Sequence, residues 1–229
     1  MVDGVCSVGG EELLQDAWGV DVALTASQKA MGVPPGLALV SAGPRAMDAW
    51  RARKTKVPSL YLDFGEWLPI MEAYEKGQAA YFATPAVNLV AGLDVSLAEL
   101  VREGMDARTK RHLRLAGAFR AAWRALELRA LAVRDDIMAN TLSALYFPSG
   151  VDASLVGRVR AEGVVIAGGL HPEVRAKYFR VGHMGALRES DVVATVGAIE
   201  RALIAGGHRV EPGVGVAAAQ SVLAERRHA

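Results

Sequence analysis

The amino-acid sequence predicts an α/β protein whose C-terminal part forms a smaller α+β unit. Three short apolar segments separated by turns open the chain, as is typical of strands in a buried sheet. Two long stretches with apolar residues at helical spacing follow, and strand-like and helix-like segments then alternate. Of the 229 residues, 52% are hydrophobic, which is enough to bury a substantial core.

The first part of the chain predicts three strands and a helix. Residues 2–10 (VDGVCSVGG) are apolar and end in a Gly-Gly break, so we predict a buried strand that runs into a loop. Residues 20–26 (VDVALTA) alternate and contain β-branched side chains, which favours a second strand. Residues 37–41 (LALVS) form the third, and residues 44–53 begin with the proline that favours a helix start. These strands are expected to belong to a larger sheet.

The middle of the chain predicts two amphipathic helices, at residues 85–103 and 106–132. Arg, Lys and Glu lie between their apolar residues, and we interpret them as a solvated face. One buried stripe is predicted, consisting of Leu115, Phe119, Trp123 and Leu126.

The C-terminal part predicts a separate α+β unit, because strand-like and helix-like segments lie close together there. The predicted strands are residues 143–147, 164–167 and 178–182, and the predicted helices are residues 154–162 and 189–205. The Ala- and Arg-rich tail after Pro212 is expected to form a last helix that frays.

Composition narrows the class of protein. Lys and Arg number 26 and Asp and Glu 25, for a net charge of +1, so no overall charge favours nucleic acid or anionic lipid. No apolar run reaches the roughly 18 residues of a membrane span, and the N-terminus does not have the pattern of a signal peptide. The single cysteine, Cys6, excludes an internal disulfide and fits a reducing compartment. We expect a soluble cytoplasmic protein.

Two residues near the start are candidates for cofactor chemistry. Lys29 lies just after a predicted strand and before a turn rich in Gly and Pro, where a partly desolvated amine can act as a Schiff-base nucleophile. Asp3 lies at the end of another predicted strand, where a carboxylate can pair with a pyridinium nitrogen. The alternatives are a surface lysine in a loop and an ordinary capping aspartate, and spacing alone does not decide between them.

Three further residues near predicted strands carry reactive groups. Arg180 lies inside an apolar strand, where its guanidinium suits either a substrate carboxylate or a buried ion pair with a protein carboxylate. His183 has no second His or Cys at ligand spacing, so we predict a structural histidine and no metal site. Cys6 has no recognisable His partner and is expected to be a small buried residue.

Five motifs resemble a known family in the same order. They are residues 2–10, residues 27–36 (SQKAMGVPPG), residues 53–56 (RKTK) followed by 61–63 (YLD), residues 81–85 (YFATP) and residues 179–185 (FRVGHMG). Together they are similar to the class V aminotransferases of fold type I, and most of all to the alanine–glyoxylate and serine–pyruvate or serine–glyoxylate group. The resemblance covers nearly the whole chain and weakens at residues 133–140 and after Ala205.

The resemblance implies pyridoxal 5′-phosphate as the cofactor. Lys29 would bind it covalently and move a proton between the substrate Cα and the cofactor C4′. Asp3 would hold the pyridine nitrogen, Val5 would pack against one face of the ring, and Gln28 would lie beside the cofactor.

The resemblance also implies a homodimer and a binding mode for the substrate. Tyr81 and Thr84 would reach across the dimer interface to the phosphate bound in the other subunit. Arg180 would take the α-carboxylate of the amino or keto acid. The reaction implied is transfer of an amino group from alanine or serine to glyoxylate or pyruvate.

The resemblance implies a domain division at residues 1–84, 85–132 and 133–229. The first is the C-terminal part of the cofactor-binding large domain, the second holds the linking helices, and the third is the small α+β domain. The family's phosphate-holding turn and ring-stacking aromatic residue precede the strand at Asp3, and we expect the chain to lack them. We therefore expect the chain alone to bind the cofactor poorly and to have little or no activity.

Two alternatives to transamination follow from the same motifs. A related fold type I lyase such as a cysteine desulfurase needs a mobile catalytic cysteine, whereas Cys6 lies beside Asp3 in the first motif. The chain is alternatively a non-catalytic remnant or a dimerisation partner that lends Tyr81 and Thr84 to another subunit.

Overall fold

The N-terminal part of the computed structural model, which describes residues 1–225, is built on a three-stranded sheet. The strands β1 (Val2–Asp3), β2 (Val22–Ala26) and β3 (Ala38–Ala42) lie in the order β1-β2-β3. β1 is parallel to β2, with Asp3 opposite Leu24, and β3 is antiparallel to β2. The three predicted strands are therefore present as one sheet, and the first two end on the same side.

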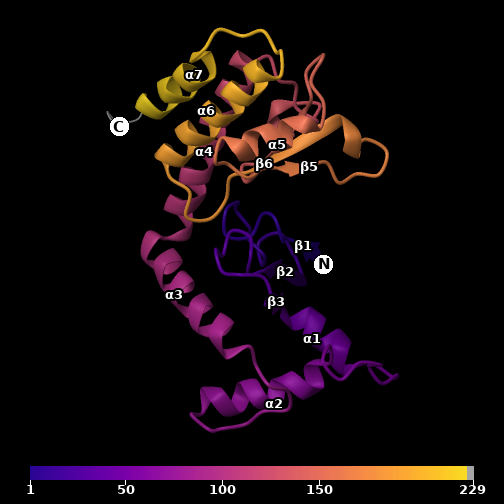
Figure 1. Ribbon diagram of the computed structural model, residues 1–229. Helices are drawn as coiled ribbons and strands as arrows, with labels where there is room; N and C mark the ends of the chain where they lie inside the picture. Colours follow the sequence, from indigo (N-terminus) through magenta and orange to yellow (C-terminus); the bar gives the residue numbers. More distant parts are fainter. Residues whose placement is uncertain (226–229) are drawn as a thin grey trace.

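Four helices connect this sheet to the C-terminal part of the chain (Figure 1). They are α1 (Pro44–Arg51), α2 (Phe64–Glu75), α3 (Val87–Glu103) and α4 (Met105–Ala125). The α1 helix begins with proline at its first position, as predicted. Gly104 separates α3 from α4 with a φ of 80°, a conformation that favours glycine, so the chain turns sharply between them.

The C-terminal part is an α+β unit. Its second sheet has the order β4-β6-β5, with both pairs antiparallel. Its elements are β4 (Leu142–Tyr146), α5 (Ser154–Ala161), β5 (Ala167–Gly168), β6 (Tyr178–Gly182), α6 (Glu189–Ala205) and α7 (Val214–Ala224), with short 3₁₀ turns at Asp135–Ile137 and Arg175–Lys177. Figure 1 shows β1–β3 below this unit, with α3 running along one side of them.

The main core surrounds α4. The predicted stripe of Leu115, Phe119, Trp123 and Leu126 is confirmed, because all four side chains are at most 2% exposed. They pack with residues of β4, β6, α5, α6 and α7 in one apolar cluster. The helix α4 therefore contributes to the core of the C-terminal unit, while the division into domains at residues 84 and 132 stays a prediction.

The structure corrects the bounds of three predicted elements. The first strand does run into a loop, but it covers only Val2–Asp3 and is not buried, since Val2 is half-buried and Asp3 exposed; the Asp3 carboxylate accepts a hydrogen bond from the Val5 amide and starts a turn. The helix α4 ends at Ala125 and not at Ala132, since Glu127 has a φ of 55°. The strand predicted at residues 164–167 is shorter and begins later, as β5 at Ala167. The Val164 amide still donates to the Val159 carbonyl oxygen at the end of α5.

The helix α2 was not predicted from the sequence. It contains Pro69, which normally ends a helix, and it begins at an Asp63 cap whose carboxylate accepts from the Gly65 amide. The predicted last helix is present as α7, while its predicted fraying lies outside the described residues. No helix within residues 1–225 is long and apolar enough to cross a membrane.

Candidate functional site

The turn that carries Lys29 begins directly after β2 and is closed at its base by Ser27. The Ser27 hydroxyl donates to the Pro34 carbonyl oxygen at 2.7 Å and accepts from the Leu37 amide at 3.2 Å. The Ser27 amide also donates to the Leu37 carbonyl at 3.1 Å. Within the turn, the Gly32 amide donates to the Lys29 carbonyl at 2.9 Å, and Gly32 has a φ of 71°. The backbone on both sides of Lys29 is therefore fixed.

Two helices hold the next two carbonyls of the turn. The Arg108 guanidinium of α4 donates to the Ala30 carbonyl oxygen at 2.7 Å, and the Ser96 hydroxyl of α3 donates to the carbonyl of Met31. Neither Ser96 nor Arg108 is conspicuous in the sequence, because Ser96 is a single small polar residue between Val95 and Leu97 and Arg108 lies among other polar residues of its helix. The only signal is that Arg108 precedes the buried Leu115 by seven residues and so shares its helix face.

The side chain of Lys29 has an amine that is available for a ligand. Lys29 is half-buried and the neighbouring Gln28 is exposed. Within residues 1–225, the Lys29 amine forms neither a hydrogen bond nor an ion pair. Lys110, by comparison, is ion-paired to Asp106 at 2.7 Å. A fixed backbone that carries an unpaired amine is a suitable arrangement for a nucleophile.

Asp3 lies at the same side of the N-terminal sheet as Lys29. The strands β1 and β2 are parallel neighbours, and Asp3 ends one while Lys29 follows the other. One Asp3 carboxylate oxygen accepts from the amide of half-buried Val5 at 3.0 Å, and the other has no partner within residues 1–225. Ligands of α/β sheets bind beyond the carboxyl ends of parallel strands, and Asp3, Gln28 and Lys29 all lie toward that edge of the sheet.

The segment that follows Arg180 contacts the Lys29 turn. Arg180 lies on β6, and its Nε donates to the Gly168 carbonyl oxygen at 2.8 Å. Among the described residues, no carboxylate forms an ion pair with Arg180. Gly185, five residues later, lies so close that a Cβ there would be 3.6 Å from the Ala30 carbonyl oxygen and 3.8 Å from that of Lys29. The segment that follows the predicted carboxylate-binding arginine therefore lies against the turn that carries the predicted nucleophile.

Within residues 1–225, neither Tyr81 nor Thr84 forms a hydrogen bond with Lys29. Both are exposed, and they lie in the segment between α2 and α3. The intervening Phe82 is anchored edge-on against Trp67 of α2, with ring centroids 4.7 Å apart. The role of Tyr81 and Thr84 at the phosphate of another subunit stays a prediction.

Cys6 is exposed, which corrects the expectation of a small buried residue. It lies in the turn after β1, where the backbone and not the side chain makes the contact with the C-terminal unit. The Cys6 carbonyl oxygen accepts from the Thr141 hydroxyl at 2.7 Å.

His183 is a buried residue of a hydrogen-bonded chain and is 1% exposed. Its Nδ1 donates to the Asn140 carbonyl oxygen at 3.1 Å, and its Nε2 accepts from the Ser143 hydroxyl at 3.0 Å. Ser143 in turn accepts from the Trp123 indole nitrogen at 2.9 Å. Burial lowers the pKa of His183 to about 4, so the ring is neutral at pH 7. Both nitrogens thus serve the fold.

Comparison with known proteins identifies the family. No protein-family model matches the chain. Alanine–glyoxylate aminotransferase 1 of Saccharomyces cerevisiae is 41% identical over 81% of this chain and 49% of its own length. L-aspartate–glyoxylate aminotransferase of Paracoccus denitrificans is 36% identical over 96% of this chain and 54% of its own length. The chain thus spans about half the length of the curated relatives it matches.

The fold agrees with the sequence comparison. The crystal structure of pyridoxamine–pyruvate aminotransferase from Mesorhizobium loti superposes with a TM-score of 0.88 and 32% identity, over 98% of this chain and 57% of that one. Aminotransferases of fold type I depend on pyridoxal phosphate. The chain belongs to the class V aminotransferases of fold type I and matches the C-terminal part of their fold.

Proposed function

We propose that the protein takes part in pyridoxal-phosphate-dependent transfer of an amino group between alanine or serine and glyoxylate or pyruvate. The observation that carries this proposal is the Lys29 turn. It presents an amine without a partner within residues 1–225 on a fixed backbone, at the same edge of the sheet as Asp3. The names of the relatives, which are aminotransferases acting with glyoxylate, support the choice of the second substrate.

The residues around Lys29 fit the cofactor. The Lys29 Nζ would hold the cofactor through its carbonyl carbon, and the Asp3 carboxylate oxygen that has no partner would pair with the protonated pyridine nitrogen. Val5 and Gln28 would lie against and beside the ring. When bound, pyridoxal phosphate supplies an electron sink for the electrons that remain when the substrate Cα loses its proton.

Lys29 and Arg180 act on different groups of the substrate, namely the Cα proton and the α-carboxylate. The Arg180 side chain is fixed through Nε to Gly168, which leaves the two terminal nitrogens to bind the two oxygens of an α-carboxylate. With the carboxylate held, the Lys29 amine accepts the proton that leaves Cα. A small amino acid then needs no further side-chain contact for orientation.

We propose that this chain alone has weak or no activity. Amine nucleophiles of this kind are activated by removal from water, yet residues 1–225 leave Lys29 half-buried and Gln28 and Asp3 exposed. We also propose a homodimer in which Tyr81 and Thr84 contact the phosphate of the partner, since both are exposed and the family resemblance assigns them that role.

The test is covalent capture of the cofactor. The purified chain is mixed with millimolar pyridoxal phosphate, its visible spectrum is recorded, and borohydride is added before peptide mass spectrometry. We expect a yellow protein with the cofactor fixed mainly on Lys29, and loss of the colour in Lys29→Ala. Lys110→Ala is the matched control, because Lys110 is an exposed and ion-paired lysine of α4.

Two outcomes would contradict the proposal. Capture spread equally over the exposed lysines, or unchanged colour in Lys29→Ala, would show that Lys29 is an ordinary loop lysine. Amino transfer from alanine to glyoxylate is measured on portions of the same preparations taken before borohydride is added. Rapid turnover by the chain alone would refute its proposed weak activity while leaving the assignment of Lys29 intact.

A further inference from the structure

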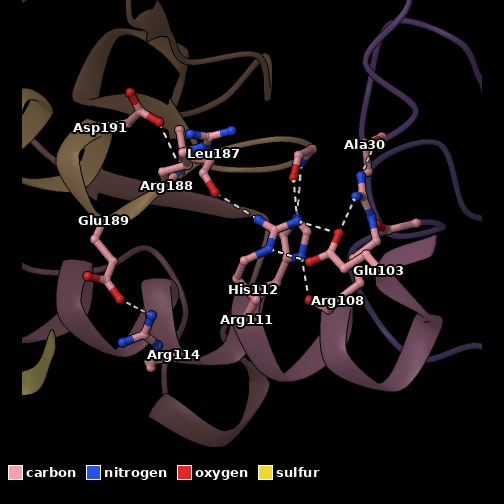
Figure 2. A network of polar contacts seen from close by, with 12 residues as sticks. Ala30, Glu103, Arg108, Arg111, His112, Arg114, Leu187, Arg188, Glu189 and Asp191 are labelled. Atoms are coloured by element: carbon pink, nitrogen blue, oxygen red, sulfur yellow. Dashed lines mark hydrogen bonds and ion pairs between the residues drawn. The ribbon is translucent and has the colours of Figure 1, made fainter. Parts of the chain in front are cut away.

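Four polar residues form one cluster where α3 meets α4 (Figure 2). Glu103, the last residue of α3, bonds Arg108 at 2.8 Å through Oε2 and Arg111 at 2.5 Å through Oε1. The bond from Arg111, followed by that from Arg108, lowers the pKa of the Glu103 carboxyl to about 2, although partial burial opposes the shift. His112 lies beside them on α4. We call these four residues the corner cluster.

One arm of the corner cluster binds the segments that carry the proposed cofactor site. Arg108 is only 6% exposed, and its Nε donates to the Gly9 carbonyl oxygen at 2.6 Å. Its Nη2 donates to the carbonyl oxygen of Ala30, the residue after Lys29, at 2.7 Å. Arg108 thereby joins the loop after β1 to the turn after β2.

The other arm binds the segment that follows Arg180. Arg111 donates to the carbonyl oxygens of Gly185 at 3.0 Å and Leu187 at 2.8 Å. His112 accepts from the Gly185 amide at 3.0 Å through Nε2, so its Nδ1 carries the proton and donates to the Arg108 carbonyl at 2.8 Å. Desolvation lowers the pKa of His112 and favours the neutral ring that this arrangement needs.

We propose that Arg108 and Arg111 are positioning residues for the proposed reaction, and that Glu103 couples them. Each guanidinium is held by the same carboxylate, and each uses its remaining hydrogens on one of the two segments that supply Lys29 and Arg180. Neither arginine is placed on substrate or cofactor. The cluster keeps the amine and the carboxylate-binding guanidinium at a constant separation. This inference rests on the proposed function, but the effect of the cluster on the two segments can be measured without the cofactor.

The first test measures hydrogen exchange of single amides by NMR in Arg108→Met. This variant keeps the length of the side chain and removes its bonds to both carbonyls and to Glu103. We expect at least tenfold faster exchange at Gly32 and Val33 in the Lys29 turn. Through Glu103 and Arg111 we also expect faster exchange at Gly185, which Arg108 does not touch.

Arg124→Met is the matched control. Arg124 lies on the same helix, is ion-paired to Asp135 and contacts neither of the two segments. It should leave exchange at Gly32, Val33 and Gly185 unchanged. Acceleration limited to the Lys29 turn in Arg108→Met would overturn the coupling through Glu103. Equal acceleration at the core amides of α6 would mean that the whole fold had been weakened, and it would also overturn the proposal.

The second test connects the cluster to Lys29. Borohydride capture of pyridoxal phosphate on Lys29 is compared between wild type and Arg108→Met, with capture on Lys110 as the internal reference. A five-fold or larger fall in the ratio, partly restored by Arg108→Lys, is the expected result. An unchanged ratio would refute the positioning role and leave the proposed function standing. Absence of preferential capture on Lys29 in wild type would refute the proposed function, and the purpose of the cluster with it.

Discussion

The stability of the fold should depend on pH through His183. Its pKa lies at about 4 in the folded protein, against the ordinary histidine value of 6.5, which represents the unfolded chain. Between these values the unfolded chain binds a proton that the buried ring does not, so stability falls as the pH falls. The full difference of about 2.5 units corresponds to about 3 kcal/mol, of which about 2 kcal/mol is lost between pH 7.5 and pH 5.

Urea unfolding of wild type and His183→Gln at the two pH values isolates this contribution. Glutamine does not titrate, so the stability advantage of wild type over the variant should shrink by about 2 kcal/mol on going from pH 7.5 to pH 5. His112 also has a lowered pKa, but it is present in both proteins and cancels in the comparison. A constant advantage, or an NMR titration of His183 near pH 6.5, would refute the reasoning.

Two further substitutions test the loops around the candidate site. Gly10→Ala would place a Cβ 2.6 Å from Cγ2 of Thr141, and we expect a loss of about 1–3 kcal/mol in urea unfolding; wild-type stability would show that the loop moves aside freely. Ser27→Ala removes the hydroxyl that donates to Pro34 and accepts from Leu37. It should cost about 1–3 kcal/mol and speed exchange of the Leu37 amide, and unchanged exchange would mean that another group replaces the hydroxyl.

Periodicity predicted the parts of the fold that are fixed by burial. The bounds of β6 and α6 were predicted to the residue, because an apolar strand and a long amphipathic helix each bury one continuous face. The stripe from Leu115 to Leu126 was likewise predicted from helical spacing. The helix α2 was missed because local sequence rules treat Pro69 as a helix breaker. The start of α2 depends on the Asp63 cap and on contacts of aromatic residues that are distant in sequence.

The candidate site was only partly predictable. The positions of Lys29 and Asp3 relative to strand ends follow from local patterns, and their side-by-side placement needs the parallel pairing of β1 with β2. The corner cluster has no local signal, because Glu103 and Arg108 resemble a solvated helix face in the sequence. Arg108 is buried because two loops that lie 99 and 78 residues away along the chain dock on it through the carbonyl oxygens of Gly9 and Ala30.

The corner cluster binds main-chain atoms, and this determines which positions around the site can change their side chains. Arg108, Arg111 and His112 contact main-chain groups of Gly9, Ala30, Gly185 and Leu187. Gly9 and Gly185 have φ values of 88° and 86°, a conformation that favours glycine, so these two positions are restricted. The bonds to the carbonyl oxygens of Ala30 and Leu187 do not depend on the side chain at those positions, provided that the backbone keeps its path. Under the proposed positioning role, variation in the docked loops outside the two glycines would therefore leave the separation of Lys29 and Arg180 unchanged.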